Sequence, residues 1–292
     1  MPPNVWLAQD NANPEIKYIL KRPSEDKPHT KESHITALTA FTHELEMQKL
    51  FAQEPMIRSL VDYIPDSEPT GPMMVLEANT RPFTTTEIKW IMKGVLLGIF
   101  TVHMKGLVYT DLKLENVALG GFDPAKPNDN VRDLIVRLAD CGSSIRPSTA
   151  TRQITSLTYR SPEVHFGEPW SQSTDVWSWG VILAQLLQAQ VDFQSPGMYY
   201  SMSVGTLVEK EKAIRDQFAI DFDLSSVPLY AEDEQCAKLL PAAQPEEAYM
   251  WANTMVEKGV AGEDIQFLVE VLHPDPEARL TIPEILESGY LD

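Results

Sequence analysis

The spacing of apolar residues changes near Asn79, and this change limits the folds open to the chain. Before Asn79, short apolar runs on either side of turn residues predict two strands within 5–21. A helix is expected over about 35–52, and two short apolar segments follow near 57–63 and 73–76. After Asn79, apolar residues recur at three- and four-residue steps. Strands followed by helices predict an α+β fold that divides near Asn79.

The second part of the chain begins with a long apolar helix. Thr84-Thr85-Thr86-Glu87 has the residue types of a helix cap, and the apolar pattern behind it continues to about Met104. Two short strands are predicted at 117–119 and 134–138, and further helices at 173–189, 204–219, 245–257, 263–271 and 281–288. The larger part is therefore expected to be mainly helical.

The charge of the chain argues against one large class of partners. Lysine and arginine number 24 against 42 aspartate and glutamate, which gives a formal net charge of −18. Because duplex DNA is normally bound by a basic stripe, nucleic acid is not expected as a partner. Residues 205–292 hold 19 of the acidic residues and 6 of the basic ones. This surplus fits either a docking surface for basic protein segments or ordinary solvated helix faces.

Neither a targeting signal nor a membrane span is visible in the sequence. The longest apolar stretches, such as 179–187, are much shorter than the roughly 18 residues that a span needs. We therefore expect an intracellular protein, cytoplasmic or nuclear, with no membrane partner. The two cysteines argue against a disulfide scaffold. Cys141 is expected to pack as a small buried thiol, whereas the acidic stretch around Cys236 predicts exposure.

Five motifs follow one another in the second part. The first is Asp-x-Lys-x-x-Asn at Asp111–Asn116, directly after an apolar helix and before an apolar strand. By itself this pattern also fits a solvated loop. The other four are Asp140-Cys141-Gly142, the Thr-Tyr-Arg-Ser-Pro-Glu run Thr158–Glu163, the segment Ser173–Gly180, and His273–Thr281. Five motifs in this order are far more informative than any one of them.

The ordered series resembles the catalytic domain of eukaryotic protein kinases over nearly the whole chain. The run Tyr159–Glu163 resembles the branch that holds cyclin-dependent, mitogen-activated, dual-specificity and SR-protein kinases. The resemblance implies one two-lobed domain, with a small β-rich N-lobe over 1–78, incomplete at its first strand, and a larger, mainly helical C-lobe over 79–292. It also implies transfer of the γ-phosphoryl group of Mg-ATP to a serine or threonine hydroxyl of a protein.

The same resemblance assigns roles to residues of the motifs. Asp111 would accept or orient the proton of the substrate hydroxyl, and Lys113 would place positive charge near the transferring phosphoryl group. Asn116 and Asp140 would hold Mg²⁺, which prefers oxygen ligands. Ser156 would contact Asp111.

Two further contacts implied by the resemblance are structural. Glu163 would form an ion pair with Arg279. Asp175 would brace the loop that carries Asp111. Both contacts join segments far apart in the sequence, so the structure can test them directly.

Contacts with the nucleotide are implied in the first part of the chain. Tyr18-Ile19-Leu20-Lys21 matches the Val-Ala-Ile-Lys frame of kinases, so Lys21 would hold the α- and β-phosphates, and Glu44 would pair with it. Lys17 and Glu46 remain alternatives.

The segment Leu76-Glu77-Ala78-Asn79 resembles the hinge between the two kinase lobes. Leu76 would be the gatekeeper, and the backbones of Glu77 and Asn79 would meet adenine. Ala118 would lie beneath the base.

The sequence also departs from the kinase pattern. None of the 14 glycines precedes Gly71, and Val5 matches the valine just after the glycine-rich phosphate loop, so that loop is missing. Thr110 stands where an arginine usually grips a phosphorylated loop, and Cys141 replaces an aromatic residue. Ile19 replaces the small residue that packs on adenine. Two functions therefore stay open: an active kinase, and a pseudokinase that acts as a protein-binding scaffold.

Overall fold

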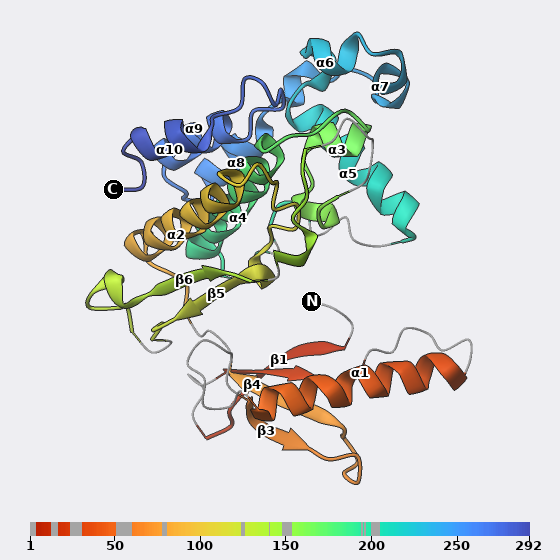
Figure 1. Ribbon diagram of the computed structural model, residues 1–292, viewed down its shortest axis with the longest axis vertical. Helices are drawn as coiled ribbons and strands as arrows, with labels where there is room; N and C mark the ends of the chain where they lie inside the picture. The colour runs from red at the N-terminus through yellow and green to blue at the C-terminus, as the bar shows by residue number, and fades with distance from the viewer. Residues whose placement is uncertain are drawn as a thin grey trace. The chain divides into compact units, whose positions relative to one another are not determined.

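The computed structural model describes residues 4–12, 17–23, 31–50, 60–77, 81–123, 126–139, 141–147, 154–193, 195, 197–199 and 205–292. The chain forms two compact units (Figure 1). The first consists of Met1–Arg81 with Leu119–Ile135, and the second of Pro82–Ala118 with Val136–Asp292. The first unit therefore takes one segment from the middle of the chain.

A four-stranded antiparallel sheet forms the first unit, in the order β1-β2-β4-β3. Val5 of β1 (Val5–Gln9) lies opposite Lys21 of β2 (Lys17–Lys21), which confirms the strand pair expected within 5–21. The other two strands are β4 (Met73–Glu77) and β3 (Leu60–Ile64). In β2 the side chains alternate between the two faces, so Ile19 and Lys21 share one face.

The helix α1 (Lys31–Leu50) covers that face of the sheet (Figure 1). Phe41 and Leu45 of the helix form a buried cluster with Met74 and Leu76 of β4, and Ile19 packs against this cluster. Ile19 therefore contributes to the core between helix and sheet, which holds the two in register.

The strands β5 (Val117–Gly120) and β6 (Ile135–Leu138) pair in a two-stranded sheet. They lie at the two ends of Leu119–Ile135, the segment that belongs to the first unit. Gly121 follows β5 with φ 74°, and a Cβ atom there would lie 2.2 Å from the carbonyl oxygen of Asp133. Only glycine fits so close an approach. Arg81 ties the segment down, because its guanidinium donates to the carbonyl oxygens of Asp123 and Lys126.

Helices form most of the second unit, around a core in which α2 (Thr85–His103) packs on α4 (Ser173–Val191). The indole of Trp179 in α4 is fully buried and donates to the carbonyl oxygen of Met92 at 2.9 Å. The other helices are α3 (Pro162–Phe166), α5 (Leu207–Asp221), α6 (Pro228–Ala231), α7 (Glu234–Leu239), α8 (Met250–Glu257), α9 (Gly262–Val271) and α10 (Ile282–Glu287). The predicted α+β class is confirmed.

The predicted start of α2 is confirmed in detail. The hydroxyl of Thr84 accepts a hydrogen bond from the backbone N–H of Glu87, whose carboxylate accepts one from the N–H of Thr84. This reciprocal capping box satisfies two donors that the first turn leaves unpaired. The same arrangement begins α5 and α10.

One predicted helix, over 245–257, is interrupted in the structure. A short 3-10 turn spans Pro245–Glu247, and α8 begins only at Met250. Between them Tyr249 has φ 58°, and its N–H donates to the carbonyl oxygen of Asp221. A left-handed residue cannot continue a helix, so the segment divides there.

The expectation that Cys236 is exposed is wrong. Its side chain, which belongs to α7, is fully buried, and its thiol donates to a carboxylate oxygen of Glu168 at 3.0 Å. Burial, together with the Glu168 carboxylate, holds the pKa of this thiol well above its usual range. A buried protonated thiol is unreactive.

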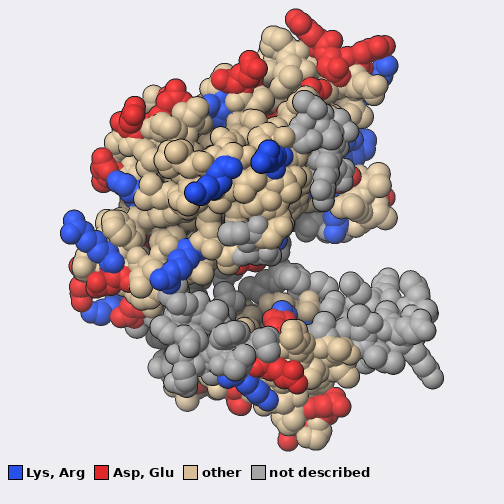
Figure 2. Space-filling view, in the orientation of Figure 1, with Lys and Arg blue, Asp and Glu red and all other residues tan. Residues whose placement is uncertain are grey.

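Figure 2 shows where acidic side chains gather on the second unit. Exposed acidic residues crowd the end that carries α6 and α7, among them Glu232 and Glu234. Among the described residues, no helix combines the length and the apolar character that crossing a membrane requires.

Candidate active site

The loop between α2 and β5 brings the first motif together around one carboxylate. Lys113 Nζ and Asn116 Nδ2 both donate to Asp111 Oδ2, at 2.7 and 3.1 Å. Ser156 Oγ donates to Asp111 Oδ1 at 3.0 Å. Asn116 Nδ2 also donates to the backbone carbonyl of Asp111, at 2.8 Å, which fixes the loop between the two residues. Asp111 is therefore held by an ammonium, an amide and a hydroxyl.

A pocket of about 470 Å³ opens beside this carboxylate. Its lining is mostly polar, with Thr110, Asp111, Ser143, Thr155 and Ser156 among the contributing residues. Lys113 Nζ lies 3.4 Å from Ser156 Oγ, so positive charge reaches the same place as the carboxylate. The pocket is suited to a hydroxyl group that approaches Asp111.

The carboxylate of Asp175, at the start of α4, braces the loop from below. Its Oδ1 accepts from the N–H of Thr110 at 2.9 Å, and its Oδ2 accepts from the N–H of Tyr109 at 2.7 Å. His103 Nε2 lies 2.8 Å from the same Oδ2. The predicted brace is thus present, and His103 is a third partner that the sequence did not indicate.

Of the proposed magnesium ligands, Asn116 lies within the described residues and Asp140 outside them. Because Nδ2 of Asn116 donates twice to Asp111, its amide oxygen is the atom that it can offer to a cation. An amide oxygen is a ligand that Mg²⁺ accepts, so this residue fits the ion. Behind Asp140, Cys141–Ser143 forms a short 3-10 turn.

The proposed phosphate-binding residues lie in the first unit. Lys21 Nζ contacts both carboxylate oxygens of Glu44, at 2.5 and 2.7 Å, and joins β2 to α1. Lys21 and Glu44 therefore form an ion pair, whereas the side chain of the alternative Lys17 lies outside the described residues. Both side chains of the pair are half-buried, so the ammonium remains accessible to an anion.

The proposed hinge residues are only partly described. Leu76 is buried in the cluster beneath α1, Glu77 ends β4, and Asn79 lies outside the described residues. Ala118 is half-buried in β5.

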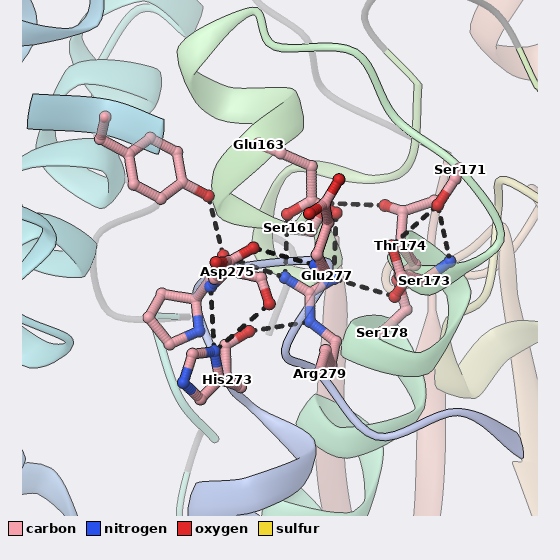
Figure 3. A network of polar contacts seen from close by, with 12 residues as sticks. Ser161, Glu163, Ser171, Ser173, Thr174, Ser178, His273, Asp275, Glu277 and Arg279 are labelled. Carbon is pink, nitrogen blue, oxygen red and sulfur yellow. Dashed lines mark hydrogen bonds and ion pairs between the residues drawn. The ribbon is translucent and has the colours of Figure 1, made fainter. Parts of the chain in front are cut away.

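A buried ion pair supports the second unit from within, as the sequence predicted. Arg279 Nη1 and Nη2 donate to the two carboxylate oxygens of Glu163, each at 2.9 Å (Figure 3). The remaining N–H groups of the guanidinium donate to the carbonyl oxygens of Ser173, His273 and Pro274. All five donors of Arg279 are satisfied, and its charge lies over the ring of Trp177.

Comparison with known protein families gives one match. The family model of the protein kinase domain matches residues 8–291 of this chain. The chain belongs to the protein kinase family.

Relatives of this kinase domain include a cyclin-dependent kinase, in agreement with the branch that the sequence predicted. It is 26% identical to cyclin-dependent kinase G1 of Arabidopsis thaliana over 221 residues, which cover 74% of this chain and 33% of that protein. It is also 26% identical to cell division control protein 2 homolog 3 of Trypanosoma brucei brucei over 303 residues, which cover 98% of this chain and 86% of that protein. The chain spans about a third to a half of the length of several of the curated relatives that it matches.

The fold is also found among solved structures. The crystal structure of the yeast RNA Pol II CTD kinase CTDK-1 complex matches with a TM-score of 0.54 at 17% identity, over 98% of this chain and 88% of that one. This likeness shows that the kinase domain has the same fold.

Besides His103, the sequence analysis did not identify the polar contacts of Thr155, Arg160 and Glu211. Thr155 donates to the carbonyl oxygen of Thr110 at 2.8 Å, and Arg160 pairs with Glu211 at 3.1 Å. Their contacts cross 45 and 51 residues of sequence and depend on backbone geometry, so no local pattern predicts them.

Proposed function

We propose that this kinase domain transfers the γ-phosphoryl group of Mg-ATP to serine or threonine hydroxyls of proteins. The observation that carries the proposal is the environment of Asp111, where a carboxylate, an ammonium and a hydroxyl converge on one polar pocket. Phosphoryl transfer needs these parts: a group that orients the attacking hydroxyl, and fixed positive charge beside the transferred group.

Each residue has a defined part in the reaction. The substrate hydroxyl oxygen attacks the γ-phosphorus while the bond to the ADP oxygen breaks, and its proton passes to the Asp111 carboxylate. Lys113 places positive charge beside the developing negative charge. Ser156 donates its hydroxyl to Asp111 Oδ1, and a carboxylate oxygen has a second lone pair that can accept a substrate hydroxyl.

The remaining residues would bind the nucleotide and its metal ion. Bound Mg²⁺ would supply charge neutralisation on the phosphates, with Asn116 and Asp140 as its ligands. Lys21, oriented by Glu44, would hold the α- and β-phosphates. Leu76, Glu77, Asn79 and Ala118 are proposed to surround adenine.

Substitution of Asp111 tests the proposal. Phosphate incorporation into a mixture of serine- and threonine-containing peptides, measured by mass spectrometry with Mg-ATP, should fall by about a thousandfold in Asp111→Asn. Asp129→Asn is the matched control, because Asp129 is an exposed carboxylate paired with Lys126. Equal transfer by Asp111→Asn and the wild type would overturn the assignment.

A pseudokinase scaffold is the competing function, and it is favoured by Cys141 in place of the usual aromatic residue. Mg-ATP raises the unfolding temperature of any protein whose folded state binds it. The absence of both this stabilisation and phosphate transfer would favour the scaffold over the kinase. The acidic surface at α6 and α7 would then suit basic protein segments, as it would for substrates of an active kinase.

A further inference from the structure

Two threonines beside the proposed active site share an unusual backbone conformation. Thr110 has φ 65° and Thr155 has φ 68°, both in the left-handed region. Residues with a branched Cβ rarely adopt this region, because the side chain crowds the backbone. Each threonine directly precedes a residue of the site, Asp111 in one case and Ser156 in the other. Strained backbone of this kind persists only where surrounding contacts hold it.

Contacts hold Thr110 from three directions. Its N–H donates to Asp175 at 2.9 Å, and its hydroxyl donates to the carbonyl oxygen of Ser143 at 2.7 Å. Its own carbonyl oxygen accepts from Thr155 Oγ1 at 2.8 Å. That carbonyl belongs to the peptide that joins Thr110 to Asp111, so the Thr155 hydroxyl fixes the peptide plane in front of Asp111.

Two hydrogen bonds therefore join Thr155–Ser156 to Thr110–Asp111. Thr155 Oγ1 contacts the backbone in front of Asp111, and Ser156 Oγ contacts the Asp111 side chain at 3.0 Å. Lys113 and Asn116 already hold Oδ2 of Asp111. The contacts from Thr155 and Ser156 add a hold on the preceding peptide and on Oδ1, so both the backbone and the carboxylate of Asp111 are oriented.

The Thr155 end of this connection is itself anchored. Arg160 donates to the carbonyl oxygens of Thr155 at 3.3 Å and of Ile154 at 3.0 Å, and it pairs with Glu211 of α5 at 3.1 Å. The Arg160 side chain is almost fully buried. Arg160 thus connects the backbone of Thr155 to α5, and this connection fixes the position of the Thr155 hydroxyl relative to the helices of the second unit.

We propose that Thr155 is a positioning residue for the reaction, and that its hydroxyl orients Asp111 through the carbonyl group of Thr110. This inference rests on the proposed function, since it assigns Asp111 a catalytic part. Thr155 itself is assigned no contact with the substrate. Removing the hydroxyl should slow the chemical step and leave substrate binding nearly unchanged.

Three variants of the full chain separate the hydroxyl from the shape of the residue. Thr155→Val keeps the branched Cβ, and with it the backbone strain, but loses the hydroxyl. Thr155→Ser keeps the hydroxyl, and Thr155→Ala deletes it should valine prevent folding. We expect Thr155→Val to lower kcat about tenfold, with the KM values for ATP and peptide changed less than about twofold. Thr155→Ser should retain at least about half of kcat.

Hydrogen–deuterium exchange of the amides of residues 109–116 provides a second readout that needs no activity. Exchange there should be faster in Thr155→Val than in Thr155→Ser. Unchanged kcat in Thr155→Val, or equal losses in the valine and serine variants, would overturn the proposal. If the wild type transfers no phosphate, the proposed function fails, and the exchange experiment still decides the connection: equal rates in the two variants would disprove it.

Discussion

The Lys21–Glu44 pair of the first unit and the Glu163–Arg279 pair of the second have the same chemistry in different surroundings. Side chains of the first pair are 30% and 38% exposed, whereas those of the second are both 0% exposed. Lys21 contacts Glu44 with one ammonium, while Arg279 meets Glu163 with two parallel hydrogen bonds. Water can replace the partner in the first pair but not in the second.

This difference separates an ion pair that solvent can reach from one that it cannot. An exposed pair contributes about 0–1 kcal/mol to folding, because water and salt screen it. A buried charge that loses its partner is destabilising by about 3–5 kcal/mol. The partly exposed ammonium of Lys21 can therefore exchange its partner for an anion such as a phosphate, whereas Arg279 serves to hold the second unit together.

Removal of the buried carboxylate should have the largest effect. In Glu163→Gln the Arg279 charge stays buried and loses its counter-ion, so the free energy of unfolding should fall by about 3–5 kcal/mol. Urea unfolding followed by tryptophan fluorescence reports this, because five of the six tryptophans belong to the second unit. The exposed Glu277→Gln is the matched control. A loss below about 1 kcal/mol would contradict the structural role.

Asp221 sharpens the comparison, because it is a buried carboxyl whose hydrogen bonds come from neutral groups. Tyr199 and Gln217 donate to it at 2.8 and 2.7 Å. Burial raises its pKa above the ordinary 3.8. The folded state then binds a proton that the unfolded state has already lost, so stability is full below 3.8 and falls as the pH rises through the raised pKa.

The Asp221→Asn variant should lose this pH dependence. The difference in unfolding free energy between the wild type and Asp221→Asn should move against the wild type as the pH rises, with urea titrations at several pH values as the measurement. Asp66→Asn, at an exposed position, controls for general charge effects. If the difference in unfolding free energy between the wild type and Asp221→Asn stayed constant at all these pH values, Asp221 would have an ordinary pKa.

Local signals explain what the sequence could predict. The cap of α2 was readable because Thr84 and Glu87 contact one another three residues apart. The β1–β2 pair was readable from turn residues between two apolar runs. The ion pair of Glu163 and Arg279 spans 116 residues, and only the order of the kinase motifs made it predictable.

Tertiary contacts explain what the sequence could not predict. Cys236 lies in an acidic stretch, yet α7 folds it against Phe166 and Glu168, which are about seventy residues away. Tyr249 interrupts a regular helical pattern because its N–H reaches Asp221. The positive φ of Thr155 is likewise invisible in a residue type that rarely adopts it. Each of these features depends on a contact with a residue distant in the sequence, which a local sequence pattern cannot predict.

The helix cap formed by Thr84 is a neutral contact whose effect on stability can be compared with that of the partly exposed Lys21–Glu44 pair. Thr84→Ala removes the hydroxyl that accepts from Glu87, and should lower the free energy of unfolding by about 1 kcal/mol. Thr86→Ala, in the same first turn but exposed and outside the capping box, should change it by less than about 0.5 kcal/mol. Equal effects of the two variants in urea unfolding would show that the cap does not stabilise α2.

The smallest effect on folding is expected at Lys21. Because water already reaches the pair, Lys21→Met should lower stability by less than about 1 kcal/mol, as judged by hydrogen exchange of the β2 amides. Phosphotransfer, in contrast, should fall by about a hundredfold or more if Lys21 binds the phosphates. Lys49→Met makes the same change at another exposed lysine of the first unit and should alter neither quantity strongly. A stability loss as large as that of Glu163→Gln would remove the distinction between the two pairs, since Lys21 would then be a structural residue whose ammonium is not free to exchange Glu44 for a phosphate.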